Sequence, residues 1–356
     1  METTERALRI GMIGVGSWGP NLLRNLVHMN AADVVAAADL EEKNRTKIGQ
    51  TYPSLRVIED HRKIMEDPDI EAVVIATPAA THFGLVREAL ESGKHVLVEK
   101  PLCTSTDEAL QLTKMASQRG LILMVGHTFL YNAAVRKAKE YIDNRELGRV
   151  LYLYARRVNL GKVRQDVNSL WNFAPHDISI VNYLLSSAPE SVQAFGACYI
   201  QKEIEDVVFL NMRYPGGVIC ALHLSWLDPK KVRRMTIVGT EKMLVYNDVS
   251  TDQKIQLFDK GVEIKGREPG NDKMVNFGEH QVLLRSGDVL IPKLEFVEPL
   301  RVECAHFVEC CFSGENPLTD GMNGLQVVAV LEAASRSLQN SGSEVEVDYL
   351  EAREEA

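Results

Sequence analysis

The chain has 356 residues, of which 45% are hydrophobic and 25% are charged, an ordinary composition for a soluble globular protein. This length suits two domains that can bury their cores without disulfides. Lys and Arg number 40 and Asp and Glu number 49, so the net charge is −9. With no basic block in the sequence, we expect neither nucleic acid nor a membrane as a partner.

The N-terminal stretch METTERALRI lacks the apolar run of a signal peptide, and no run of about 18 apolar residues follows it. The six cysteines form no CxxC pair and show no zinc-ligand spacing. The sequence therefore predicts a cytoplasmic protein with reduced thiols and no metal site.

Strands and helices alternate in the first part of the chain. Apolar runs predict strands at residues 8–13, 34–38, 72–76, 95–98 and 121–125. Helical spacing predicts helices at residues 21–28, 43–52, 81–92 and 106–119. This alternation indicates an α/β domain with a parallel sheet covered on both faces, which we place at residues 1–126.

The pattern changes after residue 126. Strands are predicted at residues 150–158, 192–200, 207–214, 218–226, 233–238 and 241–246, and helices at residues 175–185, 299–312 and 321–338. Pro215-Gly216-Gly217 is a strong hairpin-turn signal, whereas residues 251–292 show no assignable pattern. We therefore expect a second, α+β domain at residues 127–356, with a large and mostly antiparallel sheet.

The stretch GMIGVGSWGPNLLRN contains Gly14-x-Gly16-x-x-Gly19 between the first strand and the first helix. In dinucleotide-binding domains, the first glycine makes a tight turn, the second lets the pyrophosphate approach and the third allows close helix packing. Asp39 ends the second strand, 39 − 19 = 20 residues later. A carboxylate there holds the ribose hydroxyls and repels a 2′-phosphate, which favours NAD over NADP. The alternative is a plain glycine turn with a surface aspartate. The loop residues predicted to contact the cofactor are Gly14, Val15, Gly16, Ser17, Trp18 and Gly19.

Two more strands end in polar residues. Thr77 and Pro78 follow residues 72–76, and Glu99 and Lys100 follow the apolar run of residues 95–98. Ligands collect beyond the carboxyl ends of parallel strands, so we expect these residues to line the nicotinamide side. The alternatives are turn chemistry for the first pair and a surface lysine for the second. We predict a structural role for His82.

The stretch WNFAPHDIS places His176 directly before Asp177 and an apolar helical run. His176 is either a proton acceptor in an active site or a residue packed beside a helix that Asp177 caps. A polar run precedes it, with arginines that suit a phosphate or a carboxylate. The predicted substrate contacts are Tyr131, Asn132, Arg156, Asn159, Arg164, Trp171 and Asn172.

The glycine loop, Glu99-Lys100-Pro101 and His176-Asp177 together resemble the Gfo/Idh/MocA oxidoreductase family, which includes glucose–fructose oxidoreductase and inositol dehydrogenase. The resemblance covers nearly the whole chain. It implies a Rossmann domain followed by a domain whose open sheet often forms oligomer contacts, so we expect a homodimer or homotetramer. It also implies that the C-terminal helices return toward the first domain.

The resemblance also implies that Lys100 contacts substrate and nicotinamide ribose, and that His176 faces the substrate hydroxyl. Many members carry an aspartate four residues before that histidine, where this chain has Asn172. An asparagine can orient a group by hydrogen bonds but cannot take up a proton. Acid–base work is therefore expected of His176 and Lys100.

The stretches GVGSWGPNLLRN, WNFAPHDIS and PLTDG most resemble the nucleotide-sugar branch of the family. Members of that branch oxidise or reduce C3 of UDP- or TDP-linked sugars. A dehydrogenase of a free or phosphorylated sugar or inositol is the first alternative. The others are a non-catalytic protein that binds NAD and sugar, and a lyase or hydrolase that uses bound NAD transiently.

Overall fold

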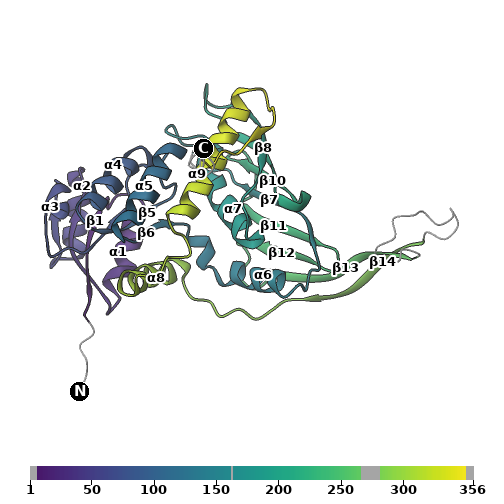
Figure 1. Ribbon diagram of the computed structural model, residues 1–356, viewed down its shortest axis with the longest axis horizontal. Helices are drawn as coiled ribbons and strands as arrows, with labels where there is room; N and C mark the ends of the chain where they lie inside the picture. The colour runs from purple at the N-terminus through teal and green to yellow at the C-terminus, as the bar shows by residue number, and fades with distance from the viewer. Residues whose placement is uncertain (1–5, 162, 266–280, 350–356) are drawn as a thin grey trace, which may run out of the picture. The chain divides into compact units, whose positions relative to one another are not determined.

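The apolar runs of the first part of the chain build a six-stranded parallel sheet in this computed structural model, which describes residues 6–161, 163–265 and 281–349. Its strand order is β3-β2-β1-β4-β5-β6. All four residues of β4 are buried, as expected for a parallel strand covered on both faces. The strands are β1 (Leu8–Ile13), β2 (Ala32–Ala38), β3 (Arg56–Ile58), β4 (Ala72–Ile75), β5 (His95–Glu99) and β6 (Leu123–Gly126) (Figure 1).

Helices connect these strands, and the predicted α/β class is confirmed. The short β3 and α3 have no counterpart in the prediction, because their few residues show no clear periodicity. The helices are α1 (Gly19–Val27), α2 (Glu42–Thr51), α3 (Arg62–Met65), α4 (His82–Glu91) and α5 (Thr106–Arg119).

Two helices from the end of the chain belong to the same body. Among the described residues, contacts group 6–132 with Phe296–Ser335 and 347–349. Thus α8 (Pro299–Ser313) packs on α1 and places Phe307 in one core cluster with Leu22. α9 (Gly321–Gln339) lies in this unit up to Ser335. The division expected after residue 126 stays a prediction.

The second unit, Ala133–Glu295 with Arg336–Glu346, is built on a nine-stranded sheet of order β14-β13-β12-β11-β7-β10-β9-β8-β15. β7 pairs in parallel with β10, and the other strand pairs are antiparallel, which confirms the mostly antiparallel prediction. The strands are β7 (Val150–Val158), β8 (Ser191–Ala197), β9 (Val207–Arg213), β10 (Ile219–Ser225), β11 (Val232–Gly239), β12 (Met243–Asn247), β13 (Ile255–Lys265), β14 (Gln281–Leu290) and β15 (Val345–Glu346).

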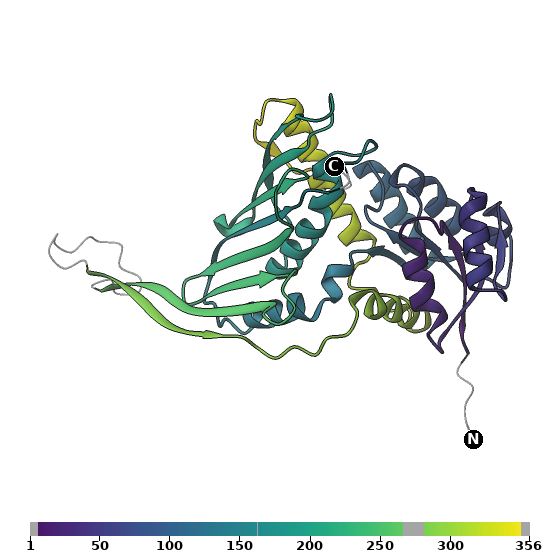
Figure 2. The same cartoon turned by 180° about the vertical axis from the view of Figure 1, so that it is seen from behind.

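The hairpin signal at Pro215 is confirmed, because residues 215–217 join the antiparallel β9 and β10, with Gly216 at φ 73° and Gly217 at φ 77°. The unassigned segment after residue 251 contains the long β13–β14 hairpin (Figure 2). Two helices, α6 (Ala133–Asp143) and α7 (Ser169–Leu185), pack against this sheet.

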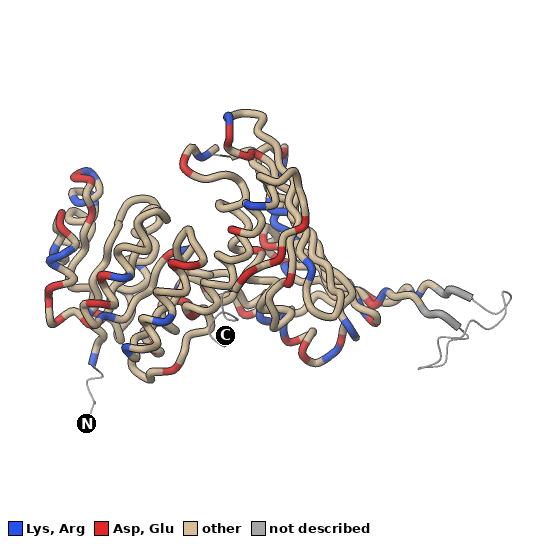
Figure 3. The backbone as a smooth tube through the Cα atoms, turned by 45° about the horizontal axis from the view of Figure 1, so that its top comes forward, with Lys and Arg blue, Asp and Glu red and all other residues tan. Residues whose placement is uncertain are grey.

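Acidic and basic residues are interspersed along the chain, without a long block of one sign (Figure 3). Over the described ranges, no helix combines the length and apolar character needed to cross a membrane. Cys103, Cys220, Cys304 and Cys310 are buried, whereas Cys198 is exposed.

Candidate cofactor and active site

The glycine loop follows β1, and its glycines have different reasons to be there. Gly14 has φ +87°, and a Cβ on it would lie 2.7 Å from the Ala76 carbonyl oxygen. A Cβ on Gly19 would collide with the carbonyl oxygen of Gly14. Gly16 differs, because a Cβ there meets only Asn44 Nδ2, at 3.3 Å. Gly14 and Gly19 are therefore required by the packing of the backbone around them. The backbone at Gly16 is instead open enough for a pyrophosphate to approach.

Asp39 lies directly after β2 with its carboxylate fixed beside this loop. Oδ2 accepts a hydrogen bond from Val15 N at 2.8 Å, and Oδ1 accepts from Glu41 N at 2.9 Å and Asn44 Nδ2 at 3.0 Å. A carboxylate has about four acceptor positions, so the oriented group retains capacity for a ribose hydroxyl.

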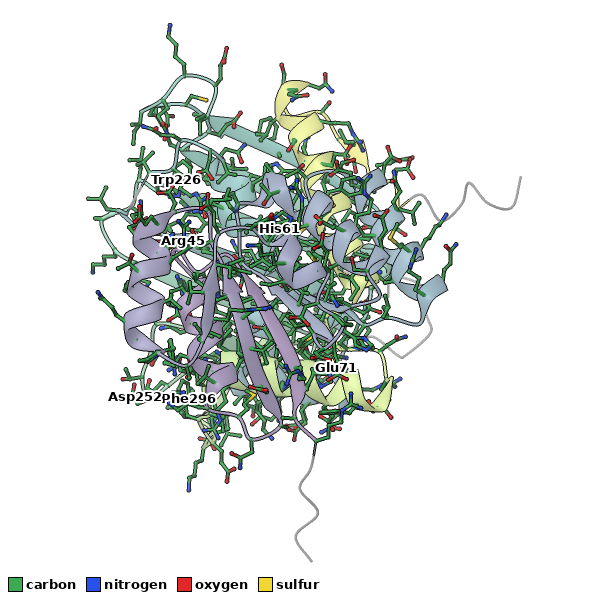
Figure 4. The ribbon with its side chains drawn as sticks, turned by 90° about the vertical axis from the view of Figure 1, so that its left-hand side faces the viewer. Arg45, His61, Glu71, Trp226, Asp252 and Phe296 are labelled. Carbon is green, nitrogen blue, oxygen red and sulfur yellow. The ribbon has the colours of Figure 1, made fainter. Side chains whose placement is uncertain are left out.

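Arg45, labelled in Figure 4, is the basic side chain bonded to this turn. Its Nη1 donates to the carbonyl oxygens of Asp39 and Leu40 at 2.9 and 2.7 Å, and its Nη2 lies 3.5 Å from Glu59 Oε2. The guanidinium thus binds protein groups in this position, and it does not form a site for a 2′-phosphate. This agrees with NAD as the cofactor.

His82 links the ends of β4 and β5. The side chain is 1% exposed, with Nε2 2.9 Å from Thr77 O and Nδ1 2.7 Å from Pro101 O. Burial lowers the pKa of this imidazole. His82 therefore holds the two strand ends together, a structural role of the kind predicted for it.

Glu99 and Lys100 leave β5 beside the glycine loop. The Glu99 carboxyl group accepts a hydrogen bond from the Trp18 side chain, and its Oε2 accepts one from Lys100 N at 3.3 Å. Burial raises the pKa of Glu99 to about 7, against the lowering effect of the Lys100 charge. The end of β5 is thereby tied to the loop that is predicted to hold the pyrophosphate.

Two buried ionisable residues near this strand end are absent from the sequence prediction. Glu303 on α8 is fully buried, and its Oε2 accepts from Thr128 Oγ1 at 2.9 Å. Burial and the nearby Glu99 raise its pKa well above the usual range. His127 is also fully buried, with Nδ1 2.6 Å from Asn323 Oδ1, and burial lowers its pKa to about 4.

Glu303 has a signal in the sequence that the prediction did not use. Leu300, Cys304 and Phe307 form the buried stripe of α8, and Glu303 lies on that same face at helical spacing. A carboxylate on an apolar stripe needs an explanation, because burial of an unpaired charge is costly.

In the second unit, α7 begins earlier than predicted. It starts at Ser169, and the Asn168 side chain accepts a hydrogen bond from Trp171 N at 3.0 Å as the N-cap. The alternative in which Asp177 caps the helix is therefore wrong. His176 lies inside the helix, one turn after Asn172 and on the same face.

Asp177 pairs instead with Arg157 of β7. Its carboxylate oxygens lie 2.7 and 2.9 Å from Nε and Nη2 of the arginine, and both side chains are buried. Arg157 therefore anchors α7 to the sheet. Side chains alternate along a strand, so Arg156 faces the other side, where it contacts Asp228 at 3.0 Å. The structure thus places Arg156 and Arg157 on opposite faces of the sheet.

The other predicted substrate contacts are spread over both units. Tyr131 is 2% exposed and belongs to the core cluster of the first unit, with its hydroxyl 3.3 Å from Thr319 Oγ1. Asn132 is buried in the same unit. In the second unit, Arg164 is exposed and bound to Asp166 at 2.9 and 2.5 Å. The remaining predicted contacts, all partly buried, are Asn159, Trp171 and Asn172.

The family follows from comparison with known proteins. Residues 8–127 match the oxidoreductase family with an NAD-binding Rossmann fold, and residues 135–245 match the GFO/IDH/MocA C-terminal domain. The chain belongs to this family of oxidoreductases, and its first unit is the NAD-binding domain.

Named relatives act on different substrates. The scyllo-inositol 2-dehydrogenase (NAD(+)) of Bacillus subtilis (strain 168) is 25% identical over 98% of this chain and 98% of its own length. The UDP-N-acetylglucosamine 3-dehydrogenase of Acidithiobacillus ferrooxidans is 28% identical over 66% of this chain and 72% of its own. The structure of levoglucosan dehydrogenase in complex with NADH has a TM-score of 0.81 at 20% identity, covering 96% of this chain and 100% of that chain, which shows a common fold.

Proposed function

We propose that the protein transfers a hydride between a secondary alcohol of a sugar and NAD, with Lys100 and His176 as its acid–base pair. One observation carries this proposal. Lys100 leaves β5 at the sheet edge that also bears the glycine loop, and Trp18 of that loop is bonded to the adjacent Glu99. A cation at this position suits an alcohol that reacts beside the nicotinamide.

The residues divide the work of alcohol oxidation. NAD supplies the hydride chemistry when it is bound. A neutral imidazole is a suitable general base, so we assign to His176 the acceptance of the hydroxyl proton. Lys100 stabilises the developing alkoxide as a fixed positive charge. Asn172, one turn before His176, orients the alcohol by hydrogen bonds.

For the substrate we propose C3 of a nucleotide-linked sugar, on the strength of the resemblance to that branch and of the relative that acts on UDP-N-acetylglucosamine. The second candidate is a free or phosphorylated sugar or an inositol. Two observations favour this second candidate: the inositol dehydrogenase aligns over nearly the whole chain, and Arg156 and Arg164 are already paired with carboxylates.

A substrate screen tests the proposal. Purified protein with NAD is offered UDP-sugars, TDP-sugars, inositols and sugar phosphates while NADH absorbance is followed. We expect kcat/KM for a nucleotide sugar to exceed that for any inositol by about tenfold or more. A preference for inositol would select the second candidate. Conversion of a substrate without release of NADH would identify the transient use of NAD.

We further propose that the protein forms a homodimer or homotetramer through the second sheet. One face of this sheet carries exposed apolar side chains on neighbouring strands, and Phe209 stacks on His223 with ring centroids 4.5 Å apart. Such a patch is typical of a protein interface. The exposed side chains are Tyr152, Tyr154, Phe195, Phe209 and Ile219. A monomer in sedimentation experiments would contradict this proposal.

A further inference from the structure

The carboxyl groups of Glu99 and Glu303 are not used by the proposed reaction. Glu303 is fully buried, and Glu99 is a half-buried residue whose Oε1 is enclosed. They come from β5 and α8 and meet beside the end of β6, where Glu99 pairs with Gly126 and Glu303 contacts Thr128. The charge of Glu99 acts on Glu303. Each has one oxygen engaged by the protein, with Lys100 N on Glu99 Oε2 and Thr128 Oγ1 on Glu303 Oε2. Within the described part of the chain, Oε1 of each is buried and has no hydrogen-bond partner.

Gly126 packs closely against the Glu99 carboxyl group and has no side chain to crowd it. A Cβ on Gly126, at the end of β6, would lie 3.2 Å from Glu99 Cδ and 3.3 Å from Oε1. Two carboxylates buried close together cannot both be ionised at ordinary cost, so the pair retains a proton. Carboxylic acid pairs of this kind titrate as a unit.

The position of the pair relates it to the redox end of the cofactor. Asp39 after β2 marks the adenosine half, and a dinucleotide crosses the point between β1 and β4 where the strand order reverses. The nicotinamide half of the dinucleotide is therefore expected beside the carboxyl ends of β4 and β5. Glu99 ends β5, and its carboxyl group is bonded to Trp18 of the glycine loop.

We propose that Glu99 and Glu303 form a redox-linked proton site, which releases a proton when the cationic nicotinamide of NAD⁺ binds and keeps it when neutral NADH binds. The step is balanced: the protein with both carboxyl groups protonated and NAD⁺ give one proton in solution and the NAD⁺ complex, in which Glu99 is ionised and Glu303 stays protonated. It requires only dinucleotide binding, and so it does not depend on the proposed substrate.

The ionisable neighbours of the pair are consistent with such a site. Lys100 at the end of β5 favours the ionised form of Glu99, and burial opposes it and raises the pKa of Glu99 to about 7. Cys304 on α8 interacts with both carboxyl groups, and burial raises its pKa so that the thiol stays neutral. His127, after β6, interacts with the Lys100 charge, and burial keeps it neutral by lowering its pKa to about 4.

The sign of the effect follows from linkage. A nearby positive charge favours the ionised carboxylate, so NAD⁺ lowers the pKa of the pair and expels a proton. NAD⁺ therefore binds more tightly as the pH rises through neutrality. The affinity of NADH, which lacks the ring charge, changes less over the same range.

Isothermal titration calorimetry of the full chain tests this directly. Titrations in two buffers of different ionisation enthalpy give the protons released on binding. At pH 7 we expect about 0.3–0.5 proton for NAD⁺ and close to none for NADH. From pH 6 to 8, we expect the Kd of NAD⁺ to fall about threefold or more.

Variants of the two glutamates test whether the proton released on NAD⁺ binding comes from them. The pair E99Q/E303Q should lose the release with NAD⁺, and its NADH affinity shows whether the cofactor site has survived. E298Q is the matched control, because Glu298 precedes α8 but is half-exposed and bound to Arg24. Equal proton counts for NAD⁺ and NADH in the parent protein would overturn the proposal, whether or not the variants fold. So would undiminished release in the E99Q/E303Q protein.

Discussion

The two units bury ionisable side chains in opposite ways. In the second unit, Arg157 and Asp177 form an opposite-charge pair with two hydrogen bonds, which fastens α7 to β7. In the first unit, Glu99 and Glu303 form a like-charge pair, and each keeps a buried oxygen without a partner in the described chain. The first arrangement fixes a structure, whereas the second holds a group whose charge can change. This contrast separates residues that maintain the fold from residues that respond to the cofactor.

Lys100→Ala is expected to have the largest effect. It removes the cation beside the like-charge pair, so turnover should fall by about 10²–10⁴-fold, while NAD still binds and the unfolding temperature changes little. Steady-state kinetics and cofactor titration give these values. Unchanged turnover would remove Lys100 from the mechanism, and a large loss of stability would break the contrast between the units.

Asp177→Asn should mainly lower stability, in contrast to Lys100→Ala, which should mainly lower turnover. It leaves the buried Arg157 without its counter-charge, which should lower the free energy of unfolding by about 3–5 kcal/mol. Denaturant unfolding measures the loss, and the double replacement R157M/D177L should recover much of it because no unpaired charge remains. If Asp177→Asn is as stable as the parent protein, the pair is not the anchor of α7.

His176→Asn tests whether His176, the neighbour of Asp177 on α7, is the general base of the reaction. Turnover should fall by about 10²-fold, and the acid limb of the pH–rate profile should flatten, since the imidazole must be neutral to accept the proton. Stability should stay near that of the parent. An unaltered acid limb would assign the base elsewhere.

Asp39→Ala addresses the adenosine end of the first unit and should have the smallest effect. The loss of its hydrogen bonds should weaken NAD binding by about tenfold and reduce the discrimination against NADP. Asp33→Ala is the control, because Asp33 is exposed on the same strand. Equal affinities of the parent protein for NAD and NADP would contradict the role of Asp39.

Local patterns predicted the cofactor unit well. The alternation of apolar runs and helices fixed the parallel sheet, and the spacing of Gly14, Gly16 and Gly19 before a helix located the glycine loop. These features depend on neighbours in sequence, so a single chain reveals them.

Features that depend on distant partners were harder to predict. The partner of Asp177 could not be predicted, because Arg157 lies on another element and the sequence around Asp177 offers a helix cap as an alternative. The position of Glu303 on the apolar stripe of α8 was visible in the sequence, but its proximity to Glu99 was not, because the two residues are about 200 positions apart. The separation of Arg156 from Arg157 could be read from the sequence, because adjacent residues of a strand face opposite sides.

The discontinuity of the first unit has a consequence for how the protein is made. Its first strand begins at Leu8, but Glu303 and the apolar stripe of α8 are synthesised almost 300 residues later. During translation the early strands and helices leave the ribosome without the helix that covers Leu22. We therefore expect the nascent NAD-binding domain to expose an apolar surface until α8 has emerged, and to depend on chaperones during that interval.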